Sequence, residues 1–225
     1  MKAAALVALA LVCLIAPPSL ASSVPFTSSG ISGNDTGVTF DGLIDYDEAT
    51  GVLQITLNNT SPLNSSATGL AFNIAGSPDV TVAYDDTDNA ATAGVAEDAF
   101  ALETALGFAP FGEFEYGLSS QNSGSNNAQG VNPGESGTFT FNLSGPDIGD
   151  LNALSFISAL STIPPGTQPS LFGLRFQSVG DDFQGSDRAT AVPGGTPIPL
   201  PPGAWVGLAS LGGMAVAHLR RKLVA

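Results

Sequence analysis

Short stretches in which apolar and polar residues alternate recur along the middle of the chain. The clearest covers residues 138–143, where Phe139, Phe141 and Leu143 fall on one face of an extended chain. A period of two is typical of a strand with one buried face. Runs of the same kind predict strands over 38–46, 52–57, 69–74, 80–84, 114–118, 138–143 and 171–176.

The segments between these strands are rich in turn-forming residues. Residues 47–51 are expected to form a turn, and 119–136, rich in Ser, Asn and Gly, a long loop. A short helix is predicted over 150–160 with Asp150 as its N-cap, and a weaker helical pattern covers 96–106. Many short strands separated by turns are typical of an all-β domain, so we expect a β-sandwich or jelly roll with short helices.

The chain begins with an apolar run that carries no charge after its first two residues. Lys2 precedes the run 3–16, and Ser19-Leu20-Ala21 matches the small-x-small pattern of a signal-peptidase site. We therefore predict a signal peptide over residues 1–21, cleaved after Ala21; the alternatives are an uncleaved anchor and a buried helix. Cys13, the only cysteine of the chain, would leave with it, so the mature chain would have no thiol.

The C-terminal segment joins a proline-rich stretch, an apolar run and a cationic end. Residues 204–219 carry no formal charge, and a helix of about 16–17 residues is about 25 Å long, the short limit for a bilayer core. Trp205 is placed as an interfacial anchor, and Arg220, Arg221 and Lys222 as a cytoplasmic membrane stop. We expect one transmembrane helix here, and the alternative is a buried terminal helix of the soluble domain.

This order of proline motif, short apolar helix and terminal arginine cluster resembles a PEP-CTERM sorting signal, the substrate tag of exosortases in bacteria of the Gram-negative type. The resemblance covers residues 196–222. In place of the Pro-Glu-Pro of the namesake motif the chain has Pro197-Ile198-Pro199, followed by Leu200-Pro201-Pro202, which is closer to the Pro-Leu-Pro variants of the family. The residues of the sorting motif are therefore Pro197, Pro199, Leu200, Pro201 and Pro202.

The resemblance implies that an exosortase-like membrane protease is a partner and cleaves near the proline motif. The protein would pass through the inner membrane, be held there by its C-terminal helix, and reach the cell surface or the outside after processing, often among exopolysaccharide. The expected domains are a signal peptide (1–21), an acidic β-sandwich ectodomain (22–192) and a segment of linker, transmembrane helix and basic tail (193–225). Within this division, residues 190–202 are expected to form the linker.

The ectodomain is strongly acidic. It holds all 20 acidic residues of the chain but only Arg175 and Arg188 of its basic ones, so its formal charge is −18. Such a surface repels nucleic acid and attracts cations. Carboxylates clustered in a loop are ligands that calcium prefers, and the best cluster is Asp85, Asp86 and Asp88. The sequence thus predicts either a calcium site at this cluster or a solvated acidic turn.

The residue types that most catalytic sites need are missing from the ectodomain. It has no histidine or lysine, which excludes Ser-His-Asp and Ser-Lys nucleophiles and histidine-ligated metals. Glycoside hydrolysis needs only two carboxylates; the candidates for that chemistry are Glu97, Glu103, Glu113 and Glu115, of which the last two fall on one side of a strand.

Two further motifs have structural explanations. Asp35-Thr36-Gly37 matches the tripeptide of aspartic proteases, but there is no second copy, so we interpret it as a turn before the strand that follows. Phe108, Phe111 and Phe114 are interpreted as core residues rather than a sugar-binding platform.

The function that follows is that of a non-catalytic secreted or cell-surface protein without a cofactor, unless the cluster of Asp85, Asp86 and Asp88 binds calcium. It would be a structural or interaction component of the bacterial envelope or of the extracellular polysaccharide matrix. The alternatives are a carbohydrate- or calcium-dependent binding module and, third, a glycoside-processing enzyme.

Overall fold

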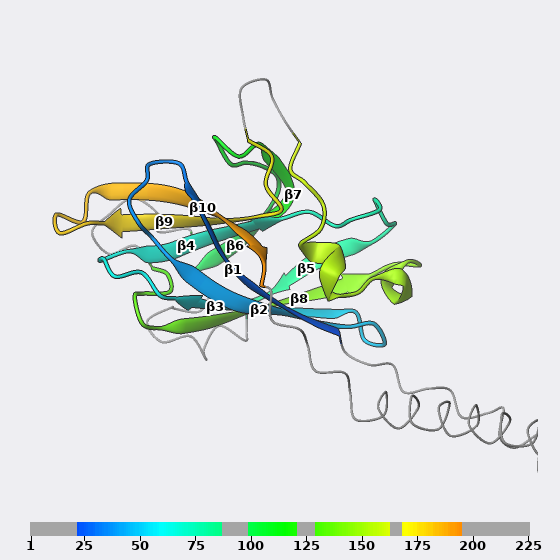
Figure 1. The fold of residues 1–225 in the computed structure, drawn as a ribbon. Coiled ribbons are helices and arrows are strands. Elements are labelled where there is room, and N and C mark those ends of the chain that lie inside the picture. Colours follow the sequence, from blue (N-terminus) through cyan, green and yellow to red (C-terminus); the bar gives the residue numbers. More distant parts are fainter. Residues whose placement is uncertain (1–21, 87–98, 121–128, 163–167, 195–225) are drawn as a thin grey trace, which may run out of the picture. The chain divides into compact units, whose positions relative to one another are not determined.

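The computed structural model describes residues 22–86, 99–120, 129–162 and 168–194, and this part of the chain consists of β-strands, turns and two short 3-10 helices (Figure 1). The strands are β1 (Ser22–Ser32), β2 (Phe40–Asp47), β3 (Val52–Asn59), β4 (Ser66–Phe72), β5 (Thr81–Asp85), β6 (Phe100–Gly107), β7 (Glu113–Ser120), β8 (Ser136–Ser144), β9 (Phe172–Val179) and β10 (Gly185–Pro193). The 3-10 helices are η2 (Ile148–Asp150) and η3 (Ala153–Phe156).

All ten strands belong to one antiparallel sheet. Their order is β5-β8-β3-β2-β1-β10-β9-β4-β7-β6, so the ladder of hydrogen bonds is continuous from β5 to β6. The expected hairpin of β2 and β3 is present, with Phe40 opposite Asn59 and Asp47 opposite Val52. The consecutive strands β1 and β2, β6 and β7, and β9 and β10 are also direct neighbours, whereas the other connections cross to strands farther along the order. β1 and β10, from the two ends of the described chain, pair at the centre of the sheet.

The sheet curls until its two halves face each other across one core. Phe72 of β4 lies 5.3 Å from Phe141 of β8, and Phe100 of β6 lies 5.1 Å from Phe139 of β8, measured between ring centroids. These strands are far apart in the strand order, so only curvature brings their rings together. The all-β prediction is confirmed, and the alternation over 138–143 gives the buried face of β8 as expected.

Three strands escaped the sequence pattern. β1 and β10 have weak apolar signals, since the buried inward residues of β10 include only alanines, Ala189 and Ala191, beside polar ones. The predicted linker over 190–202 is therefore wrong at its start, because β10 continues to Pro193. The helical pattern over 96–106 is also wrong in its described part: β6 pairs with β7, and pairing overrides the helix propensity of its Ala, Leu and Glu residues.

The helix predicted over 150–160 is replaced by two short 3-10 helices. The N-cap with side-chain bonds is Asn152 rather than Asp150: its side chain accepts a hydrogen bond from Leu154 N, and the Ser155 side chain closes a capping box. Phe156 anchors this turn in the core, with its ring 5.1 Å from that of Tyr46. Burial of one aromatic residue therefore holds a segment that is too short for a regular α-helix.

A second, smaller apolar cluster lies on the outer face of the sheet. Phe108, Phe111 and Phe114 pack there with Ala71 of β4, and all three phenylalanines are buried, which confirms their interpretation as core residues. β4 is consequently buried along its whole length. Gly173 of β9 lies opposite Ala71, and a Cβ atom at this glycine would come within 2.7 Å of the Phe108 ring. The loop of residues 108–112 is thus seated on a patch of the sheet that only small residues can form.

We predict that Gly173→Ala lowers the free energy of unfolding by about 1–3 kcal/mol, because the added methyl group overpacks the contact with Phe108. Gly107→Ala is the matched control, since a Cβ atom at this strand glycine meets no atom within 4 Å. Urea unfolding followed by far-UV circular dichroism measures both. Equal stability of the two variants would show that the loop is not seated on Gly173.

Candidate functional site

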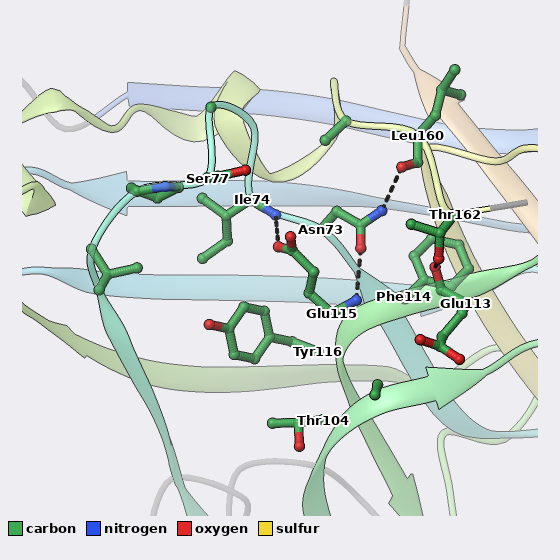
Figure 2. Close-up of a pocket in the computed structure, with 15 residues that line it drawn as sticks. Asn73, Ile74, Ser77, Thr104, Glu113, Phe114, Glu115, Tyr116, Leu160 and Thr162 are labelled. Carbon is green, nitrogen blue, oxygen red and sulfur yellow. Dashed lines mark hydrogen bonds between the residues drawn. The ribbon is translucent and has the colours of Figure 1, made fainter.

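A concave site in the described part of the chain lies along β7 (Figure 2). Its volume is about 600 Å³, and its walls come from the segment after β4 (residues 73–80), from β6 and β7, and from residues 159–162. Since it is open to solvent on one side and has both aromatic and polar walls, it is suited to a ligand of a few sugar rings or of similar size.

β7 supplies the carboxylates of this cleft. Its side chains alternate, so that Glu113 and Glu115 are exposed while Phe114 between them is buried in the outer cluster. Both glutamates are exposed, which is the pattern that alternation predicts for them. Thr162 continues the wall, because its N–H donates to the Glu113 carbonyl and the Glu113 N–H donates to the Thr162 carbonyl.

The other wall is ordered by hydrogen bonds from Asn73 and Glu115. The Asn73 side chain accepts from Glu115 N at 2.7 Å and donates to the Leu160 carbonyl at 2.8 Å, which joins the segments on both sides of the cleft. The Glu115 carboxylate accepts from Ile74 N at 3.1 Å. Figure 2 shows this network running across the cleft from Leu160 to Ile74.

Tyr116 adds an aromatic surface to the cleft. Its ring stacks on Phe72, with 5.8 Å between the centroids and 27° between the planes. Burial, together with the nearby charge of Glu115, raises the pKa of the Tyr116 hydroxyl, so it stays protonated at neutral pH and can donate a hydrogen bond. Thr104 and Ser77 add hydroxyl groups to the walls.

Two of the four glutamates that are candidates for glycoside hydrolysis, Glu113 and Glu115, line the cleft. A glycosidase places its two carboxyl groups on either side of the scissile bond, and Glu113 and Glu115 lie on one strand, separated by a single residue. Glu115 is also engaged with a backbone N–H. Of the remaining candidates, Glu103 is exposed on β6, and Glu97 lies outside the described residues.

The predicted calcium cluster is only partly within the described residues. Asp85 ends β5, and its carboxylate accepts a hydrogen bond from the Asn142 side chain at 3.4 Å; Asp86 follows it, and Asp88 lies outside the description. Among the residues that are described, no group of three or more His, Cys, Asp or Glu side chains is arranged to hold a metal ion.

The predicted sorting motif and the predicted membrane stop also lie outside the described residues. The residues of the predicted motif are Pro197, Pro199, Leu200, Pro201 and Pro202, and those of the predicted membrane stop are Arg220, Arg221 and Lys222. In residues 22–86, 99–120, 129–162 and 168–194, no helix has the length and apolar character needed to cross a membrane.

The Asp35-Thr36-Gly37 tripeptide forms a loop that is tied to a distant aspartate. The Asp187 carboxylate, which is only 2% exposed, accepts hydrogen bonds from Asn34 N, from Thr36 N and from the Thr36 hydroxyl. Burial opposes ionisation of Asp187, but these hydrogen bonds outweigh it and lower the pKa of its carboxyl below the ordinary value. The tripeptide therefore has a structural role, as interpreted, and its partner could not be found from local sequence.

Comparisons with known proteins add no relative to this geometry. No family model matches the chain, and searches of the curated proteins and of the solved structures also find no match.

We predict that Asp187→Asn lowers the free energy of unfolding at pH 7 by about 1–3 kcal/mol, because hydrogen bonds to a buried carboxylate are weakened. Because the pKa of Asp187 is lowered in the folded state, the difference in the free energy of unfolding between wild type and variant is complete above about pH 4. It is lost as the pH falls through the pKa that Asp187 has in the folded protein. Urea unfolding between pH 2 and pH 7 tests this. The exposed Asp181→Asn is the control, and a constant difference over the whole range would contradict the ionised role of Asp187.

Proposed function

We propose that this chain is a non-catalytic protein of the bacterial cell surface or exopolysaccharide matrix, exported by its signal peptide and sorted by its PEP-CTERM-like tail. The observation that carries the proposal is the order of the tail: a proline motif, a charge-free run and three cations. An exosortase-like protease would cleave near the proline motif and free the β-domain from the membrane helix.

The division of the chain supports this order. The first compact unit ends at Gly194, directly after β10, and the proline motif begins three residues later at Pro197. A cut near the motif would therefore fall beyond the last strand and leave every ladder of the sheet intact. Once the signal peptide with Cys13 is removed, the acidic all-β unit has no thiol, so its stability outside the cell would not depend on disulfides.

A second candidate function is saccharide binding in the cleft along β7, as a carbohydrate-binding module. The half-buried Tyr116 offers a stacking surface, and Thr104 and Glu113 offer exposed polar groups beside it. Sugars are held by this combination of an aromatic face and hydrogen bonds to hydroxyl groups. The network through Asn73 and Glu115 keeps the walls in place without a ligand, which reduces the entropy that binding would cost.

We predict that the protein recovered from its native source begins at Ser22 and lacks Arg220, Arg221 and Lys222. Intact-mass spectrometry of the mature protein measures both ends at once. The matched variant replaces the three cations by glutamine, which removes the membrane stop while leaving the proline motif unchanged. An unprocessed C-terminus in the wild-type protein would contradict sorting by an exosortase-like protease.

A glycan array with the purified chain, run with and without calcium, tests the binding function. We expect Thr104→Ala and Glu113→Gln to weaken a positive signal by about 2- to 10-fold each, the value of one net hydrogen bond, and Asp181→Asn to have no effect. Incubation with the bound glycan should release no product. Turnover that Glu113→Gln abolishes would instead establish a glycoside-processing enzyme, and a signal that requires calcium would establish the calcium-dependent alternative.

A further inference from the structure

The only two basic residues of the acidic β-domain lie next to each other. Arg175 of β9 and Arg188 of β10 are direct partners in the antiparallel ladder, although 20 acidic residues are spread over the same domain. Like charges in directly opposite positions destabilise a sheet. An arrangement in which both cations of a domain repel each other calls for a negative charge that the two can share.

The neighbours of the pair on this face do not supply that charge. On the side away from Arg188, Arg175 pairs with Gly69 of β4, and Gly69 pairs with Ser119 of β7. Along their own strands, the residues two positions away on the same face are Gly173 and Gln177 for Arg175, and Ser186 and Thr190 for Arg188. All of these side chains are neutral, and the nearest carboxylate along the chain is that of Asp187, the residue before Arg188.

Arg188 is held in place by neutral contacts. One of its terminal nitrogens donates to the Ala109 carbonyl at 3.0 Å, and its guanidinium lies 5.6 Å from the centre of the Phe108 ring. Its Nε atom is buried and has no hydrogen-bond partner. Burial and the charge of Arg175 both lower the pKa of Arg188, which is the electrostatic cost of this unpaired position.

The two arginines line a small pocket of about 100 Å³ between the loop at Ala109 and Pro110 and the loop at Gly33 and Asn34. Asp187 also borders the pocket. Its oxygens accept hydrogen bonds from Asn34 N and from the N–H and hydroxyl of Thr36. They also accept one from Arg188, which comes from its backbone N–H and not from its guanidinium group. With Asp187 ionised, the three charged groups sum to a net charge of +1. The pocket has room for one small group rather than for a whole sugar ring.

We propose that Arg175 and Arg188 form a binding site for a single oxyanion group, a carboxylate or a sulfate, held in the pocket beside the 109–110 loop. Arginine forks bind such groups with paired, charge-assisted hydrogen bonds. The group is a free small anion or an acidic substituent of a polysaccharide. The site is separate from the cleft along β7 and does not depend on the function proposed for that cleft or for the tail.

The first test compares the thermal unfolding midpoint of the full-length chain in sodium sulfate and in sodium chloride at matched ionic strength. We expect sulfate to raise the midpoint in a saturable way, because it binds only the folded pocket. Arg175→Gln should weaken the apparent sulfate affinity by about tenfold or more, while Arg220→Gln, which removes a cation of the tail, should leave it unchanged.

A second readout separates binding from a structural role of the arginines. In chloride alone, Arg175→Gln should be at least as stable as the wild type, since it removes a repulsion. If it is less stable, or if sulfate stabilises the wild type and this variant equally, the site is overturned. Arg188→Gln is not needed for this decision, because loss of its contact with Phe108 would itself disturb the fold.

A third comparison identifies the source of the group, with galacturonate and oligogalacturonate as probes in place of sulfate. Competition by the monomer alone assigns the site to a free small anion, and stronger competition by the oligomer, per carboxylate, assigns it to an acidic polysaccharide. The acidic surface of the domain opposes the oligomer at low salt, so this arm is run at 0.15 M ionic strength, where the Debye length is about 8 Å. Competition by neither probe, together with no effect of sulfate, overturns the proposal.

Discussion

The packing of the 108–114 segment on the outer face of β4 and β9 is the contact on which both pockets depend. Gly173 and Ala71 leave room for the phenylalanine rings, and burial of these rings fixes the backbone on both sides of them. Towards the C-terminus this segment becomes β7, with the glutamates of the cleft. At the other end of the segment, the Ala109 carbonyl accepts a hydrogen bond from the Arg188 guanidinium. A hydrophobic contact on the outside of the sheet therefore determines the position of two polar sites.

Much of the fold could be predicted from local patterns because one face of each strand is apolar. Phe139, Phe141 and Leu143 of β8 show this in the simplest form, and the hairpin of β2 and β3 follows from two such runs around a turn. Of the strands that escaped prediction, β10 buries small and polar residues instead of large apolar ones. In β10 the buried positions hold alanines and Asp187, whose burial depends on a loop about 150 residues earlier in the chain.

The candidate sites were less accessible from sequence than the fold. Alternation alone predicts that Glu113 and Glu115 share a side of the strand. It does not predict that the Glu115 carboxylate accepts a hydrogen bond from Ile74 N and is held in place by it. Asn73 and Tyr116 gave no signal, because the crossover that brings β4 beside β7 is not encoded in either segment. The arginine pair could not be predicted either, because Arg175 and Arg188 become neighbours only through the register of β9 and β10. The proposed sorting signal is the opposite case, because it is inferred from the order of its segments along the chain alone.

The two arginines of the β-domain are also the only peptide positions in residues 22–194 at which a trypsin-like protease could cut, since the domain has no lysine. Both lie inside paired strands rather than in loops. Cleavage by proteases needs a segment that can leave the sheet, and these strands occupy central places in its ladder. A β-domain built this way resists digestion by trypsin-like enzymes for as long as the sheet stays closed.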